Sequence, residues 1–226
     1  MDLLLMAIAP VFILLFYVYF RDKYEKEPVR LLIKALIAGM LSVLPILLVE
    51  SFLVRFFTME DGLFGAFWHA FVVAGFTEEL FKYLALFLLI WKNPNFNEKF
   101  DGIVYAVFVS LGFALVENIM YVTGYGFNVG LSRAWTAVPA HAIFGISMGY
   151  YFGIARMYPE LKRIYLRKAL LIPILLHGIY DFILMSGLPA LLILFVPFLI
   201  YLYYSGLRKM RIISDASIFR NIDEKP

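Results

Sequence analysis

Residues 64–91, FGAFWHAFVVAGFTEELFKYLALFLLIW, decide the class of this protein, because they combine an apolar run of membrane-spanning length with three charged side chains. A transmembrane helix needs about 20 consecutive, mostly apolar residues. A charge at the centre of a bilayer costs at least about 2.5–3.5 kcal/mol. Glu78, Glu79 and Lys82 therefore predict a helix that crosses a membrane and carries a polar site at membrane depth.

The composition extends this prediction to the whole chain. Of its 226 residues 63% are hydrophobic and 16% are charged, against about 45–50% and about 25% in an average soluble protein. We expect an all-α polytopic membrane protein with one domain, residues 1–226, in contact with the lipid bilayer and with no nucleic acid partner. The absence of cysteine excludes a thiol nucleophile, thiolate metal ligands and disulfides.

Uncharged apolar runs predict about seven transmembrane helices, with a tight hairpin between the last two. The expected spans are residues 3–20, 31–54, 64–91, 102–123, 134–155, 169–186 and 189–206. The run near the N-terminus follows Asp2 instead of a basic segment, so we interpret it as the first span and not as a cleaved signal peptide.

Basic residues fall almost entirely in alternate connections between these spans. The connections after spans one, three, five and seven carry Arg21, Lys23, Lys26, Arg30, Lys92, Lys99, Arg156, Lys162, Arg163, Arg167, Lys168, Arg208, Lys209 and Arg211. The other connections carry only Arg55 and Arg133. Since Lys and Arg collect on the cytoplasmic side, we expect the N-terminus outside the cell and the C-terminus in the cytoplasm.

Three further spans carry polar groups at similar depth. His177 and Asp181 are four residues apart on one helix face, where the carboxylate can orient the imidazole. Glu117, which precedes Asn118, has no cation nearby on its own helix. Its partner must come from another helix, with Lys82, His141 and His177 as candidates.

Within the third span, Glu78 and Lys82 are also four residues apart and should pair. Glu79 points about 100° away from Glu78 and is expected to lack a local partner. Two adjacent carboxylates in a low dielectric cannot both ionise cheaply, and a carboxyl that holds a proton suits general acid–base chemistry.

Other interpretations remain open for these groups. Each could be buried polar glue between helices, and together they could form the proton relay of a transporter or channel. The stretch Gly145-Ile-Ser147-Met-Gly149 matches a serine-nucleophile motif but lacks its strand–turn–helix context, so its glycines are interpreted as a close-packing face. Glu50 and His69 are expected nearer the outer interface and outside the site. No His-Glu-x-x-His helix is present, so a metal would need ligands from separate helices.

Taken together, Glu78-Glu79-Leu-Phe-Lys82, Phe113-x-x-x-Glu117-Asn118 and His177-x-x-x-Asp181 resemble the PrsW family of bacterial membrane proteases. The flanks Arg21-Asp-Lys-Tyr-Glu-Lys-Glu-Pro28, Phe100-Asp-Gly-Ile-Val-Tyr105 and Gly206-Leu-Arg-Lys209 agree. The family makes the first cut in an anti-sigma factor and is distantly related to the CAAX-prenyl proteases, which carry a histidine where this chain has Glu117.

The resemblance implies a multi-pass peptidase of the bacterial plasma membrane, with a single-span membrane protein as its substrate. Glu78 and Glu79 would activate water, His177 would act as ligand, base or oxyanion donor, and Asp181 would support it. Glu117 joins these four as a candidate catalytic residue, and Lys82, Asn118 and His141 are expected to support them. The oxyanion would be stabilised by His177, or by a divalent metal such as Zn²⁺ held by His141, His177 and a carboxylate, and the sequence leaves both versions open.

Overall fold

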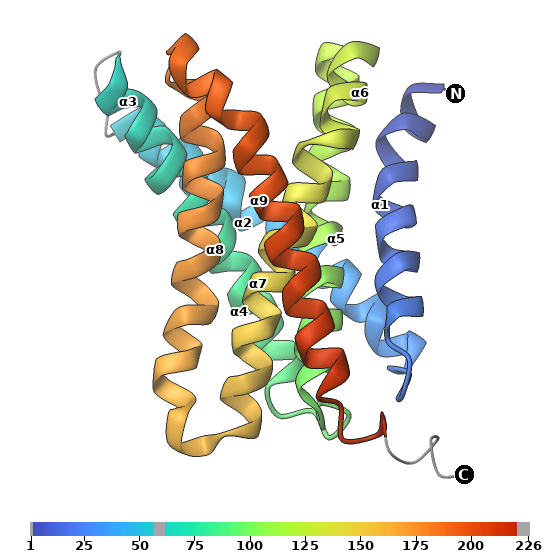
Figure 1. Ribbon diagram of the computed structural model, residues 1–226. Coiled ribbons are helices and arrows are strands. Elements are labelled where there is room, and N and C mark those ends of the chain that lie inside the picture. Colours follow the sequence, from blue (N-terminus) through green and yellow to red (C-terminus); the bar gives the residue numbers. More distant parts are fainter. Residues whose placement is uncertain (1, 57–61, 221–226) are drawn as a thin grey trace.

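The chain folds into an all-helical bundle in a computed structural model, which describes residues 2–56 and 62–220 (Figure 1). This confirms the predicted all-α class. The elements in chain order are α1 (Asp2–Arg21), α2 (Val29–Phe56), α3 (Leu63–Phe67), the π-helix η1 (Trp68–Phe76), α4 (Thr77–Ile90), α5 (Lys99–Tyr125), α6 (Phe127–Trp135), α7 (Ala137–Met157), the 3-10 helix η2 (Pro159–Leu161), α8 (Lys162–Met185) and α9 (Pro189–Asp215).

Among the described residues, five helical stretches are long and apolar enough to cross a membrane. They are Leu3–Arg21, Val29–Phe56, Lys99–Tyr125, Pro159–Met185 and Pro189–Asp215, and they correspond to the predicted spans one, two, four, six and seven. The two other predicted spans, 64–91 and 134–155, are helical but are not among these five. The turn between α8 and α9 contains Gly187 at φ 66°, as the expected tight hairpin requires.

The third predicted span is not one regular helix. A π-helical segment, η1, separates α3 from α4 directly before Glu78 and Glu79. Such segments are rare and often occur at functional sites. The η1 segment packs against α8, and a Cβ atom on Gly178 would lie 2.2 Å from the ring of Phe71. The missing side chain therefore lets α8 approach η1 closely and brings His177 beside the two glutamates.

The central helix of the bundle is α5. In α5, 78% of an apolar stretch of 18 residues is buried inside the protein. The corresponding share is 11–33% in the four other membrane-length helices. Helix α7 packs against it through the predicted glycine face, since Cβ atoms on Gly149 and Gly153 would each lie 2.2 Å from a carbonyl oxygen of α5. This close approach places His141 of α7 beside the polar residues of α5.

The short helix α6 was not predicted. It follows α5 after Gly126, whose φ of 82° favours glycine, and it ends at Trp135. Residues 124–133 were expected to form a connection between spans, with the fifth span beginning at residue 134. In Figure 1 α6 stands at the same end of the bundle as the start of α1 and the turn between α8 and α9. It therefore forms part of the wall above the polar interior.

The opposite end of the bundle holds buried carboxyl groups near the connection between α1 and α2. Asp22 and Glu27 are 1% and 3% exposed. Burial raises the pKa of Asp22 from 3.8 to about 7. Burial and the neighbouring Asp101 raise the pKa of Glu27 from 4.5 to about 10, and the Tyr105 hydroxyl donates a hydrogen bond to Glu27. Both carboxyl groups are thus accommodated best in their protonated form.

We expect the stability that protonated Asp22 contributes to be lost as the pH rises from about 4 to about 7. A carboxyl whose pKa is higher in the folded state stabilises the fold below its unfolded pKa, and this contribution disappears as the pH rises through the folded pKa. Asp22→Asn should remove much of this loss, which thermal unfolding in detergent at several pH values would measure. The exposed Glu160→Gln provides the control. An unchanged pH dependence in Asp22→Asn would contradict the expectation.

Candidate active site

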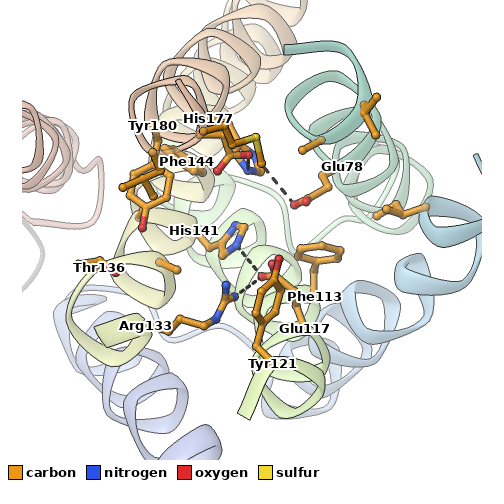
Figure 2. Close-up of a pocket in the computed structure, with 18 of the residues that line it drawn as sticks. Glu78, Phe113, Glu117, Tyr121, Arg133, Thr136, His141, Phe144, His177 and Tyr180 are labelled. Atoms are coloured by element: carbon orange, nitrogen blue, oxygen red, sulfur yellow. Dashed lines mark hydrogen bonds and ion pairs between the residues drawn. The ribbon is translucent and has the colours of Figure 1, made fainter. Parts of the chain in front are cut away.

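A cavity of about 640 Å³ lies between the helices around α5 (Figure 2). Five of the predicted polar residues line it, namely Glu78, Glu117, His141, His177 and Asp181. Residues of α2, η1 and α4 to α9 form its wall. The polar side chains on this wall are Glu50, His69, Glu78, Glu117, Tyr121, Ser132, Arg133, Thr136, His141, His177, Tyr180 and Asp181. In Figure 2, Glu78, Glu117, His141 and His177 approach the same central space from different helices.

The Lys82 ammonium group lies at the centre of the polar network. Its Nζ atom is 3.0 Å from Glu78 Oε2, 2.9 Å from Glu79 Oε1 and 3.3 Å from His141 Nδ1. The Lys82 side chain is fully buried, and its Nζ also lies 4.0 Å from the ring centre of Phe113. The predicted pair of Glu78 and Lys82 is confirmed, and the lysine joins three helices.

The expectation that Glu79 lacks a local partner was wrong. Its carboxylate contacts Lys82 through i,i+3 spacing, which also places two side chains on one helix face. Its Oε1 atom additionally contacts His177 Nδ1 at 3.0 Å. Its Oε2 atom is buried without a hydrogen-bond partner in the described part of the chain. Glu79 therefore faces the packed interior of the helix bundle, whereas Glu78 faces the cavity.

His177 lies between two carboxylates. Its Nδ1 atom faces Glu79, and its Nε2 atom is 3.2 Å from Asp181 Oδ2, which confirms the predicted i,i+4 contact. A ring nitrogen contacts a carboxylate favourably as an N–H donor. The ring stacks on Phe144 with centroids 4.9 Å apart, so its orientation is fixed by packing as well as by hydrogen bonds.

Glu117 has two partners on other helices. His141 Nε2 lies 2.9 Å from Glu117 Oε2, and Arg133 Nη2 of α6 lies 2.7 Å from the same oxygen. His141 was one of the three predicted candidates, whereas Arg133 was not considered. Arg133 also covers the ring of Tyr121 at 4.0 Å. The only sequence signal for Arg133 was that it is one of the few basic residues in the loops expected outside the cell.

Asn118, which follows Glu117 on α5, makes hydrogen bonds to two other helices, α1 and α6. Its Nδ2 donates to the carbonyl oxygen of Ala7 in α1, and its Oδ1 accepts a hydrogen bond from Arg133 Nε. The side chain is fully buried. Asn118 thus contacts Arg133 from behind the cavity wall.

Three residues were predicted to lie outside the site, and the structure shows where each lies relative to the cavity. Glu50 and His69 line the same cavity, contrary to the expectation that both lie outside the site. Ser147 is fully buried, accepts a hydrogen bond from Lys209 Nζ at 3.0 Å and does not line the cavity. The structure therefore gives the serine no access to a substrate in this cavity.

The cluster contains donors of the type that a divalent metal requires. Glu78, Glu79, His141 and His177 each offer one ligand atom, and these four atoms lie within 4.8 Å of one another. Two carboxylates and two imidazoles suit Zn²⁺, and the unpartnered Glu79 oxygen is a further donor. This group could hold a metal. The Lys82 ammonium already contacts three of the four residues, so ammonium and metal compete for the same donors.

Comparison with known proteins connects this chain to one family. Residues 27–204 match the family described as PrsW family intramembrane metalloprotease. The chain is 38% identical over 206 residues to Protease PrsW of Bacillus subtilis (strain 168), covering 91% of this chain and 92% of the relative. It is 40% identical over 216 residues to Protease PrsW of Clostridioides difficile (strain 630), with coverages of 93% and 90%. No solved structure matches the chain significantly.

Replacing Lys82 tests the network directly. We expect Lys82→Met to destabilise the protein by about 3–5 kcal/mol in chelator, because it leaves two buried carboxylates without their cation. Added Zn²⁺ should then restore more stability to this variant than to the original protein, since the donors are no longer shared with an ammonium group. Denaturant unfolding in detergent, with chelator and then with Zn²⁺, measures both effects.

The matched control for this experiment is Lys92→Met, which removes an exposed lysine just beyond α4. It should unfold like the original protein in both buffers. Equal stability of Lys82→Met and Lys92→Met in chelator would show that the ammonium does not hold the carboxylates together.

Proposed function

We propose, since this chain belongs to the PrsW family of intramembrane metalloproteases and is therefore a peptidase, that the cavity around Glu78 and His177 is its active site. The observation that carries the proposal is that the two glutamates have different surroundings. Glu78 faces the cavity, while Glu79 is held behind it by Lys82 and His177. One carboxylate can thus meet water and substrate while the other fixes its surroundings.

In the proposed reaction, Glu78 accepts a proton from a water molecule as the water oxygen bonds to the scissile carbonyl carbon. General acid–base catalysis of this kind contributes about 10²–10⁴-fold. Glu78 then returns the proton to the amide nitrogen as the C–N bond breaks. Lys82, which contacts the same carboxylate at 3.0 Å, holds Glu78 in place during both transfers.

The negative charge on the carbonyl oxygen needs a donor, and His177 supplies it. Its Nε2 atom contacts Asp181, which also lines the cavity and whose side chain is 16% exposed. A substrate oxygen can compete with Asp181 for this N–H group. Electrostatic stabilisation of this kind is often the largest catalytic contribution. Asp181 and Glu79 hold the ring from both sides between the steps.

A divalent metal such as Zn²⁺, if bound, would be held by His141, His177 and the glutamate pair and would act as a Lewis acid on the scissile carbonyl. In the absence of a bound metal, Glu117, which is itself held by Arg133, fixes His141 through its Nε2 atom. The Nδ1 atom of His141 then accepts a hydrogen bond from Lys82.

The arrangement of charges supports seven spans with the N-terminus outside and the C-terminus in the cytoplasm of a bacterial cell. Basic residues collect at the connections following α1, α4 and α7. The cavity is lined instead by Ser132 and Arg133 of α6, at the opposite end. We place the active site in the outer half of the membrane, within one domain formed by the whole chain.

An outward-facing site suits cleavage of a single-span membrane protein at or just outside its outer membrane boundary. By its resemblance to the PrsW family, the substrate would be an anti-sigma factor, and the cut would be the first of two. The transporter alternative receives no support from family membership, because the relatives carry the name of a protease.

Removing the catalytic groups should abolish this cleavage without unfolding the protein. We expect Glu78→Gln to lower the cleavage rate by about 10²–10⁴-fold and His177→Ala by about 10²–10³-fold. Cleavage of a co-expressed single-span anti-sigma factor, followed by immunoblot, provides the measurement, and purified variants should elute as folded protein. Normal processing by folded Glu78→Gln would refute the assignment, whereas Glu160→Gln, on the exposed η2 segment, should cleave normally.

The orientation can be tested with single cysteines because the chain contains none. We expect a membrane-impermeant maleimide to label Tyr125→Cys, at the end of α5, in intact cells. Lys162→Cys, at the start of α8, should react after permeabilisation only. Both side chains are exposed, so access and not burial decides the result. The reverse labelling pattern would invert the proposed topology.

A further inference from the structure

One carboxylate on the cavity wall remains without a countercharge after the others are paired. Glu78 pairs with Lys82, Glu117 with Arg133 and Asp181 with His177. Glu50 lines the same cavity, yet it has no ion-pair or hydrogen-bond partner among the residues that the structure describes. The wall formed by α2 therefore carries the one unpaired carboxylate within the described part of this cavity.

Glu50 is placed on this wall by the helical repeat of α2. Val43, Ile46, Leu47 and Glu50 all line the cavity, and their spacing of three, four and seven residues puts them on one helix face. The first three are apolar, so Glu50 ends an otherwise apolar wall. A carboxylate within a membrane-spanning helix is costly and usually has a functional reason.

The surrounding charges make a positive partner favourable at this position. Glu50 shares the cavity wall with Glu78 and Glu117, and the cationic groups of this network, Lys82, Arg133 and His177, are already engaged with other carboxylates. Glu50 is not within the group that could hold a metal, and it is only partly buried. Its carboxylate is thus accessible from the cavity but separate from the catalytic cluster.

We infer that Glu50 determines substrate specificity by binding a Lys or Arg side chain of the substrate in the active-site cavity. This inference rests on the proposed function, because it assumes that the substrate chain enters this cavity. A cavity of about 640 Å³ accommodates several side chains beside the scissile bond. The apolar wall of α2 contacts the stem of the basic side chain, and Glu50 pairs with its charged end.

The test uses a quenched fluorescent peptide that contains a single apolar span and is cleaved by the purified protein in detergent. Each position within about four residues of the cut is replaced by Lys, Gln or Glu, and kcat/KM is measured for each peptide. At one position we expect Lys to be preferred over Glu by about tenfold or more, as a charge-assisted contact provides.

The variants Glu50→Gln and Glu50→Lys then show whether Glu50 causes the preference for Lys over Glu in the substrate. The ratio of Lys to Glu substrates should fall to near one in Glu50→Gln and should reverse in Glu50→Lys, whereas Glu160→Gln should keep the original ratio. A ratio measured within each variant does not depend on how much of that variant folds.

The outcomes separate this inference from the function on which it rests. A protein that fails to cleave any peptide, including the unsubstituted one, contradicts the proposed function and the inference together. A protein that cleaves the peptides with no Lys preference, or with a preference that Glu50→Gln retains, overturns the role of Glu50 alone.

Discussion

The structure depends on one buried cation, the ammonium group of Lys82, which pairs with two carboxylates inside a membrane-spanning bundle. Charged groups at this depth are tolerated when they are paired and hydrogen-bonded. Lys82 contacts Glu78 and Glu79 on its own helix and His141 on α7. Both carboxylates are thus retained inside the bundle, and the helices that carry the network must pack closely to supply its partners.

The packing of the bundle meets this requirement with small residues and one irregular helix. Glycines of α7 lie against backbone carbonyls of α5, and Gly178 of α8 lies against the ring of Phe71 in η1. The π-helical segment ends directly before Glu78 and so belongs to the geometry of the site. Packing without large side chains is the usual means of helix association in a bilayer. The same contacts that stabilise the bundle therefore bring two histidines to the glutamate pair.

Spacing along a helix made part of this site predictable. The contacts between Glu78 and Lys82 and between His177 and Asp181 follow from the helical repeat, as does the all-helical class. The contacts of Arg133 and the position of Glu50 on the cavity wall depend on how α6 and α2 fold over the cavity, which no local pattern encodes. The π-helix was missed because residues 64–91 show the apolar composition of a regular span.

The division of roles between Glu78 and Glu79 is the central claim, and a structure of a trapped complex tests it most directly. The measurement is an experimental structure of the Glu78→Gln variant with an uncleaved single-span peptide bound. We expect the scissile carbonyl carbon to lie about 3–3.5 Å from a water held by residue 78, with the carbonyl oxygen beside His177 Nε2. A peptide bound with its scissile bond outside this cavity would contradict the account.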